Sequence, residues 1–401
     1  MALMPVTEAL NAVLAGAEPC PEEKVALDAA FHRVLARDVP ALRTQPPQAM
    51  SAMDGYAVRT ADALAAGTRL KVIGEVAAGR PFNAAVGAGE AARIFTGGFV
   101  PAGADTVVVQ EVTKRDGAWV EVQKATTKGR NVRPQGLDFR LGEALFAKGH
   151  RLTARDLALA AGMNHPLLPV HRQPKVALFA TGDELVAPGM EPGPGQIVYS
   201  NGFALAALAR AEGAAVTDLG VVPDHLDETI DAVRRARDIE ADILVTTGGA
   251  SVGDHDLVQK AFAAEGMALS FWKVAMRPGR PLMHGRLGAM QVLGLPGNPV
   301  SSYVCAFLFL VPLIRKLAGR ADLVIASEPA LLGCDIPEND ERADYLRALL
   351  NDGPQGPVAT PFPTQDSSMM APLAKSGCLV IREPHAPAAK AGSACLIVRL
   401  D

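Results

Sequence analysis

A strand-then-helix order that repeats through residues 174–319 constrains the fold of this chain more than any other feature. Short β-branched and aliphatic runs alternate there with longer segments that carry apolar residues at helical spacing. The pairs are KVALFAT with GFALAALARAEG, AVTDLGVV with LDETIDAVRRARD, ADILVTTGG with DLVQKAFAAEG, and AMQVLGL with NPVSSYVCAFLFLVPLIRKLAG. This alternation is typical of a parallel sheet covered by helices, so we expect an αβα domain over residues 174–325.

The segments on either side of this domain carry different signals. Helical spacing predicts two helices within residues 5–37, VTEALNAVLAG and PEEKVALDAAFHRVLARD, and another at TARDLALAAGM, where Thr153 and Asp156 resemble a capping box. Short runs separated by Gly and Pro turns predict β structure between these helices and again after the αβα domain. The fold class is therefore multidomain α/β, with a helical/linker domain at 1–45 and 136–173, an inserted β domain at 46–135, the αβα domain, and a C-terminal β-barrel-like domain at 326–401.

Three of the expected strands end in polar loops that contain glycine. These loops are TGDEL at 181–185, TTGGASVGDHD at 246–256 and GLPGNP at 294–299. The carboxyl ends of parallel strands share one edge of a sheet, where ligands bind, and glycine lets the backbone approach a ligand closely. Tight strand-to-helix turns capped by Ser251 or Asn298 would use the same residue types, so the loops alone leave both interpretations open.

The acidic residues of these loops favour a binding site. Glu184, Asp254 and Asp256 would lie near one another, and two carboxylates about 4 Å apart repel by roughly 4 kcal/mol at an effective dielectric constant near 20. A metal ion, a proton or a cationic partner would offset that repulsion. Oxygen ligands beside phosphate groups favour Mg²⁺, which takes one or two carboxylates and keeps several waters. His255, between the two aspartates, is expected to face solvent without a role.

A basic turn, WKVAMRPGRP at residues 272–281, ends a strand near the same edge. Lys273, Arg277 and Arg280 would contact a phosphate or another oxyanion there, although a solvated basic loop has the same composition. The whole chain has a net charge of −4, which argues against a nucleic-acid partner. Five scattered cysteines without a CxxC pair favour reduced thiols in a cytosolic protein over a disulfide framework or a zinc site.

No membrane segment is expected, and the predicted location is the cytoplasm. The most apolar stretch, YVCAFLFLVPLI at 303–314, contains Pro312 and is much shorter than the about 20 apolar residues of a spanning helix. Acidic residues interrupt the N-terminus before any long apolar run, which argues against a signal peptide. The apolar stretch is therefore predicted to be a buried core helix.

Three earlier loops become informative only in combination. SAMDGYAV, FTGGFVPAGAD and GLDFR carry small residues and acids, and composition alone would make Asp54 and Asp138 turn residues. Together with TGDEL, TTGGASVGDHD, RPGRP and GLPGNPVSS, in this order and spacing, they resemble the molybdopterin molybdenumtransferase family, which is related to the C-terminal part of gephyrin. The resemblance covers nearly the whole chain, and MDGYA, GGASVGD and PGNPVS form a specific set.

The resemblance implies a function and an assembly. Members of this family take adenylylated molybdopterin and molybdate, cleave the adenylate in a Mg²⁺-dependent step, transfer molybdenum to the dithiolene and release AMP. They are elongated homodimers of four-domain subunits. The active cleft lies between the αβα domain of one subunit and the inserted β domain of the other. A molybdopterin adenylyltransferase and molybdoenzyme maturation factors would be further partners.

The resemblance also implies roles for individual residues. Asp54, Thr96 and Asp138 are expected on the partner subunit's side of the cleft, and Asp224 at the sheet edge. Glu184 and Asp256 are expected to bind Mg²⁺. The expected substrate-binding residues are Lys273, Arg277, Arg280, Gly248, Gly249, Ser251, Pro296, Pro299 and Ser367. The family often has lysines where this chain has Arg277 and Arg280, and the segment around Ser367 matches the family pattern loosely.

The sequence is compatible with two other functions. A molybdopterin adenylyltransferase would share the αβα domain, but residues 1–173 and the C-terminal β domain argue against it. A non-catalytic scaffold, as gephyrin partly is at synapses, would be expected to lose the acidic residues, and every acid expected from the motifs is present. The sequence does not distinguish molybdate from tungstate.

Overall fold

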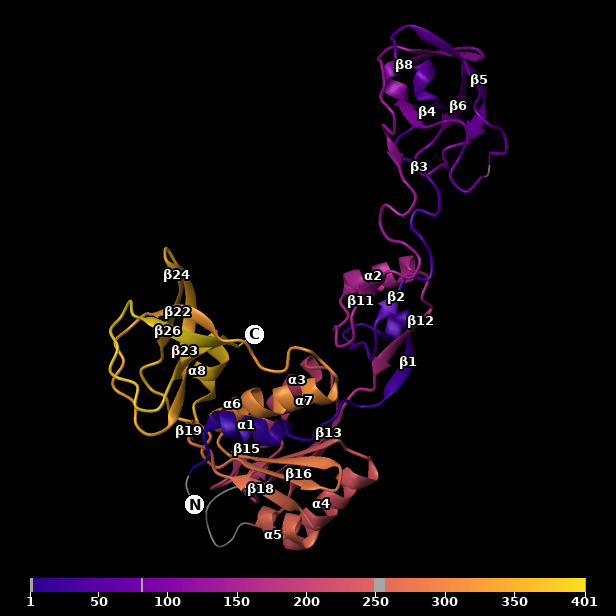
Figure 1. The fold of residues 1–401 in the computed structure, drawn as a ribbon. Coiled ribbons are helices and arrows are strands. Elements are labelled where there is room, and N and C mark those ends of the chain that lie inside the picture. The colour runs from indigo at the N-terminus through magenta and orange to yellow at the C-terminus, as the bar shows by residue number, and fades with distance from the viewer. Residues whose placement is uncertain (1–2, 81, 249–256, 401) are drawn as a thin grey trace.

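The computed structural model describes residues 3–80, 82–248 and 257–400 and shows an elongated molecule (Figure 1). The inserted β domain stands at one end of the molecule. A slender linker domain separates it from the αβα domain, and the C-terminal domain packs beside the αβα domain. The multidomain α/β fold class is confirmed.

The αβα domain is built on a six-stranded sheet with the order β16–β13–β17–β21–β20–β18. The predicted parallel strands are present as β13 (Lys175–Thr181), β16 (Ala215–Val222), β17 (Ile243–Thr247) and β21 (Met290–Leu295). β17 and β21 are buried along their whole lengths, as expected for central strands covered by helices on both faces. The expectation of a purely parallel sheet is incomplete, because β20 (Met283–Leu287) and β18 (Ala268–Trp272) extend one edge in antiparallel fashion.

Helices cover the two faces of this sheet. α4 (Leu226–Asp238) and α5 (Leu257–Ala264) pack on one face. The other face is covered by α1 (Val6–Leu14), α3 (Asn201–Ala211), and a continuous apolar helix made of α6 (Pro299–Cys305), a π-helical turn (Ala306–Leu310) and α7 (Val311–Leu317). α1 therefore packs with the αβα domain, although it falls within the range expected for the linker domain.

The continuous helix Pro299–Leu317 is the one described helix long and apolar enough to cross a membrane. Its most apolar window is 78% buried in the folded chain. It packs into the core between the sheet and α1, so the expectation of a buried core helix is confirmed. Cys305 lies within this helix and is fully buried.

The linker domain corrects one helix prediction. PEEKVALDAAFHRVLARD forms β1 (Glu22–Ala26) and a 3₁₀ turn (Leu27–Ala29) rather than a helix. β1 pairs antiparallel with β12 (Leu167–His171), and Glu22 lies opposite His171. Hydrogen bonding to a strand this distant in sequence overrides local helical spacing. The predicted capped helix is confirmed as α2 (Ala154–Gly162), where the Thr153 N–H donates to Asp156 Oδ2 over 2.7 Å.

The remaining β structure forms two further domains and several short pairs. The inserted β domain has the strand order β7–β4–β6–β5–β9–β8. Its strands are β4 (Gly55–Val58), β5 (Thr68–Val76), β6 (Glu90–Ile94), β7 (Thr106–Val109), β8 (Thr113–Asp116) and β9 (Trp119–Val122), with 3₁₀ turns at Thr60–Asp62 and Gln110–Val112. Two-stranded pairs join β2 (Val39–Pro40) to β11 (Ala144–Phe146), β3 (Met50–Ser51) to β10 (Val132–Arg133), and β14 (Leu185–Val186) to β15 (Ile197–Val198).

The C-terminal domain is a closed five-stranded barrel. Its strands are β22 (Glu328–Leu332), β23 (Ala343–Gly353), β24 (Gly356–Pro361), β25 (Cys378–Arg382) and β26 (Ala394–Arg399). The β23–β25 pairing closes the barrel, and the short β19 (Met276–Arg277) of the basic turn adds to β23. Helix α8 (Met370–Lys375) extends from the barrel toward α6. These two connections bring the C-terminal domain to the carboxyl edge of the αβα sheet.

Candidate functional site

A cavity of about 710 Å³ lies beyond the carboxyl ends of β13, β17 and β21, and we call it the sheet-edge cavity. Thr181, Thr247 and Pro296 line it directly after, or at the last residue of, these strands. Ser368 and Met370 of the C-terminal domain close another side. Its position and its size, within the about 300–1,000 Å³ of small-molecule pockets, are those of a ligand site in an open α/β sheet.

Four of the predicted site residues meet at this cavity: Glu184, Gly248, Pro296 and Pro299. The loop that carries Glu184 contains Gly182, and a Cβ there would require the flexible end of the Glu184 side chain to shift. Gly182 has a φ of 147°, a conformation that other residues rarely adopt. Glu184 is therefore the one carboxylate among the described residues of a wall that also contains glycine, proline, polar and aliphatic residues.

Several other predicted residues at this edge lie outside the described part of the chain. They are Gly249, Ser251 and Asp256, together with Asp254 and His255. Their roles stay predictions from the sequence.

The backbone conformation at the end of β17 can be adopted only by glycine at position 248. Its φ is 87°, and a Cβ there would lie 2.5 Å from the carbonyl oxygen of Thr181 on the adjacent strand. Only glycine combines this conformation with such a close approach. Gly248 therefore packs closely against the neighbouring strand at the wall of the sheet-edge cavity.

We expect Gly248→Ala to lower the free energy of unfolding by about 2–4 kcal/mol, because it adds a backbone clash to a strained φ. Urea denaturation measures the change. Gly189→Ala is a matched control, since Gly189 has a φ of 91° but open space around its missing Cβ. The control is expected to lose only about 1 kcal/mol. Equal losses in the two variants would show that the contact with Thr181 has no energetic role.

A polar segment that was not expected from the sequence, Tyr199–Ser200–Asn201, also lines the cavity. Asn201 Nδ2 donates to the carbonyl oxygen of Gly297 over 2.8 Å and so fixes the GLPGNP loop. The Tyr199 hydroxyl is buried without a hydrogen-bond partner among the described residues, and burial raises its pKa, with a smaller contribution from Asp218. The signal that could have found this segment is VYSNG, another polar stretch between a strand and a helix.

Ser367 does not line the cavity but supports it. Its Oγ accepts a hydrogen bond from Asn298 Nδ2 over 2.8 Å, and its carbonyl oxygen accepts one from the Val300 N–H over 3.0 Å. The neighbouring Ser368 lines the cavity instead. The C-terminal domain therefore holds the start of α6, and Ser367 acts as a positioning residue.

Arg277 binds the C-terminal barrel rather than the cavity. Its Nε and Nη2 donate to the two carboxylate oxygens of Asp344 over 2.7 and 2.6 Å, and Nη1 donates to Asp340 over 3.2 Å. The bidentate hydrogen bond with Asp344 raises the pKa of Arg277. This network occupies the fork that was expected to hold an oxyanion, so Arg277 is better placed to position the basic turn than to bind substrate.

Removing Arg277 is expected to destabilise the contact between these two domains. Asp344 is 9% exposed in its side chain and Arg277 is 47% exposed. Arg277→Gln should therefore cost about 1–2 kcal/mol, less than for a fully buried pair because solvent screens the exposed guanidinium. In urea denaturation, Arg277→Gln/Asp344→Asn should lose less than the two single variants together. Strictly additive losses would contradict a direct pairing.

Of the other two basic residues, Arg280 is tied to the cavity through its chain neighbour. Arg280 is exposed and precedes Pro281, which lines the sheet-edge cavity. Lys273 has a φ of 89°, and its Nζ lies 5.3 Å from the centre of the Trp272 ring. Arg280 is thus the guanidinium of this turn best placed to reach a ligand.

The predicted residues of the inserted β domain and of the linker lie in another part of the chain. Asp54 Oδ1 accepts hydrogen bonds from the Thr96 N–H and Oγ over 2.7 and 2.8 Å, which lower the pKa of Asp54 and keep it ionised. Asp138 is exposed in the linker, and its N–H donates to the Gln45 carbonyl oxygen over 3.0 Å. Within the chain, the whole inserted β domain stands apart from the αβα domain (Figure 1).

Asp224 follows β16 and is exposed near the TGDEL loop. Its N–H donates to Asp183 Oδ1 over 3.1 Å, and it is not among the described residues of the cavity wall. Across the described ranges, no group of three or more His, Cys, Asp or Glu side chains could hold a metal ion. Glu184 alone still fits Mg²⁺, since this ion is commonly bound by one or two carboxylates together with substrate phosphates.

This architecture defines a multidomain α/β protein with a cavity of small-molecule size at the carboxyl edge of its αβα sheet. Residues 4–163 match the MoeA N-terminal region (domain I and II), residues 177–316 a probable molybdopterin binding domain, and residues 329–400 the MoeA C-terminal region (domain IV). The chain belongs to the molybdopterin molybdenumtransferase family.

Relatives support this assignment over the whole length. The chain is 34% identical to a molybdopterin molybdenumtransferase of Bacillus subtilis, covering 94% of this chain and 90% of the relative. It is 33% identical to one of Haemophilus influenzae, covering 94% of both. The crystal structure of a molybdopterin biosynthesis moeA protein from Pyrococcus horikoshii OT3 superposes with a TM-score of 0.85 at 28% identity over 100% of both chains. The resemblance stated from the motifs is confirmed.

Proposed function

We propose that this protein transfers molybdenum to adenylylated molybdopterin in a Mg²⁺-dependent reaction that releases AMP. The names of the full-length relatives and the order of the matched domains support this proposal. The observation that carries it is the meeting of Glu184, Gly248, Pro296 and Pro299 at one cavity beyond the strand ends. A carboxylate on a glycine- and proline-lined wall suits an anionic ligand that arrives with a divalent cation.

The proposal assigns a role to each residue of the site. Glu184 would hold Mg²⁺, with Asp256 as its predicted second ligand, and the bound ion would offset the negative charge of the phosphate and the departing AMP. Gly248 lets the strand end pack closely behind the ligand, while Pro296 and Pro299 shape the wall against the pterin. Arg280 and Lys273 would attract molybdate. Asp224 would act at the sheet edge beside the TGDEL loop.

The proposal includes a homodimer with a shared site. The inserted β domain, which carries Asp54 and Thr96, stands apart from the αβα domain of its own chain (Figure 1). These residues would therefore reach a sheet-edge cavity only from the partner. Exposed apolar side chains, Met53, Phe99 and Leu137, lie in the segments that carry Asp54, Thr96 and Asp138. Apolar side chains exposed beside polar functional groups are typical of a surface that another subunit covers.

The proposal also includes a cytoplasmic location. All five cysteines are free, which suits a reducing compartment. A molybdopterin adenylyltransferase would supply the substrate, and maturation factors of molybdoenzymes would take the product.

A direct assay tests the function. Purified full-length protein is mixed with adenylylated molybdopterin, molybdate and Mg²⁺, and AMP and molybdenum cofactor are quantified. We expect both products to form and to require molybdate and Mg²⁺ together. Absence of AMP under metal-replete conditions would refute the proposal, and pyrophosphate release from ATP and molybdopterin would identify an adenylyltransferase instead.

A further inference from the structure

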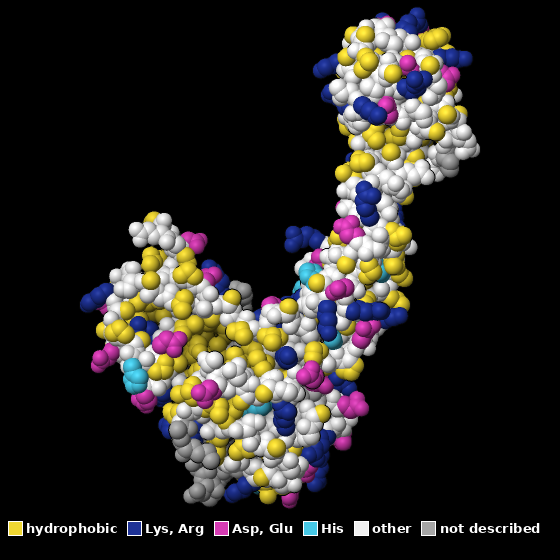
Figure 2. Space-filling view, viewed as in Figure 1, with side chains coloured by type: hydrophobic (Ala, Val, Ile, Leu, Met, Phe, Trp, Pro, Cys, Tyr) yellow, Lys and Arg dark blue, Asp and Glu magenta, His cyan; other side chains and the backbone are white. Residues whose placement is uncertain are grey.

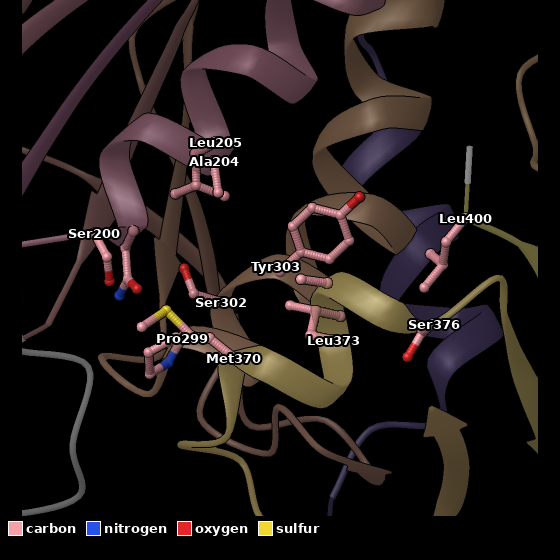
Figure 3. A pocket seen from close by; sticks show the side chains of 12 residues that line it. Ser200, Ala204, Leu205, Pro299, Ser302, Tyr303, Met370, Leu373, Ser376 and Leu400 are labelled. Atoms are coloured by element: carbon pink, nitrogen blue, oxygen red, sulfur yellow. The ribbon is translucent and has the colours of Figure 1, made fainter. Parts of the chain in front are cut away.

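A second cavity, of about 370 Å³, lies beside the sheet-edge cavity (Figure 3). α3 and α6 of the αβα domain form one side, and α8 and the end of the chain at Leu400 form the other. We call it the interdomain cavity. The residues that line both cavities are Ser200, Asn201, Pro299 and Met370. The two cavities therefore meet at the starts of α3 and α6.

The wall of the interdomain cavity suits a flat ring. Leu205, Leu373 and the Tyr303 ring make it largely apolar, and hydrophobic side chains gather where the two domains meet (Figure 2). Ser302 also lines it and is 1% exposed, and its hydroxyl has no hydrogen-bond partner among the described residues. A buried hydroxyl without a partner costs free energy unless a ligand or water pairs with it. A planar base with polar edges matches such a wall.

The boundary between the two cavities suits a phosphate. α3 starts there, and its N-cap residue Ser200 makes no side-chain capping hydrogen bond. The first backbone N–H groups of this 11-residue helix are therefore not capped by the Ser200 side chain. They form the positive end of the helix dipole, which lies at the boundary. Asn201 keeps this edge rigid through its hydrogen bond to Gly297. A phosphate group bound at this position could join one ring system in the first cavity to another ring system in the second.

We infer that the interdomain cavity binds the adenine base of the adenylylated substrate, with its phosphates at the boundary and its pterin in the sheet-edge cavity. This inference rests on the proposed function. Two adjoining cavities with an anion-compatible boundary correspond to two ring systems joined by phosphates. The C-terminal domain then contributes to substrate binding through α8.

A cavity-filling variant tests the inference. Ala204 lines the interdomain cavity from α3 and is itself exposed, so Ala204→Trp should fill the space without disturbing the core. Ala207→Trp is the matched control, because Ala207 is exposed on the same helix and lines neither cavity. Calorimetric titration of the full-length proteins would use AMP and, separately, molybdopterin without the adenylyl group.

We expect Ala204→Trp to raise the Kd of AMP about tenfold or more, while Ala207→Trp leaves it unchanged. The Kd of molybdopterin should be unchanged in both variants, which also shows that the fold is intact. Undetectable AMP binding to the wild type, or equal AMP affinity in Ala204→Trp, would overturn the inference even if the wild type inserts molybdenum. The protein could also bind AMP in a way that depends on Ala204 and yet insert no molybdenum. That result would support the adenine site and refute the proposed function.

Discussion

Replacing Glu184 with Gln should lower the rate of Mg²⁺-dependent AMP release by about 10²–10³-fold, the range seen when a preorganised electrostatic group is removed from an active site. Glu184 lines the sheet-edge cavity, is exposed there, and forms no ion pair within the described ranges. Its charge therefore has no structural partner to stabilise. The amide keeps the shape of the side chain but removes the negative charge that a divalent cation requires.

The measurement is AMP release as a function of Mg²⁺ concentration. If Glu184 holds the ion, Glu184→Gln should need a higher Mg²⁺ concentration for half-maximal rate, and thermal unfolding should be unchanged. Glu191→Gln is the control, because Glu191 is an exposed carboxylate on the following loop that lines neither cavity. Wild-type rates in Glu184→Gln, or the same loss in Glu191→Gln, would exclude a specific role for Glu184.

Mixing two inactive variants should restore activity if the site is shared between subunits. Asp54→Asn keeps an oxygen that can accept the hydrogen bonds from Thr96 but loses the charge. Alone, Asp54→Asn and Glu184→Gln should each be nearly inactive. In a heterodimer of the two, one cleft has both defects and the other has both native carboxylates. Random assortment in a two-fold symmetric dimer then gives about one quarter of the wild-type activity.

The experiment requires co-expression with two different tags, or subunit exchange before assay. The control is the mixture of the two proteins purified separately and assayed before any exchange, which should stay inactive. The geometric basis is the separation of the inserted β domain from the αβα domain within one chain (Figure 1). A mixture that remains at the level of the single variants after verified exchange would show that Asp54 and Glu184 do not act in one cleft formed by two subunits.

The sequence predicted the αβα domain well because its signals are local. Strand and helix alternate with clear periodicity from β13 to α7, and glycine marks the strand end at Gly248, where φ is positive. The carboxyl ends of parallel strands necessarily share an edge, so the meeting of Glu184 with Pro296 followed from the topology. Missing from that prediction was the antiparallel pairing of β18 and β20 at one edge of the sheet, which is not visible in any one segment.

The sequence alone determined the strand–helix alternation of the αβα domain, the edge of the sheet where a cavity would lie, and the family. Periodicity, turn chemistry and motif order are properties of short segments. Only the tertiary structure decided that residues 22–26 form a strand against β12, that Arg277 binds Asp344, and that α8 and α3 enclose a second cavity. Each of these depends on a contact between residues distant in sequence. Local propensity is weak compared with the hydrogen bonds and buried surface that such contacts supply. The structure of these segments is therefore decided by the folded chain and not by their own sequences.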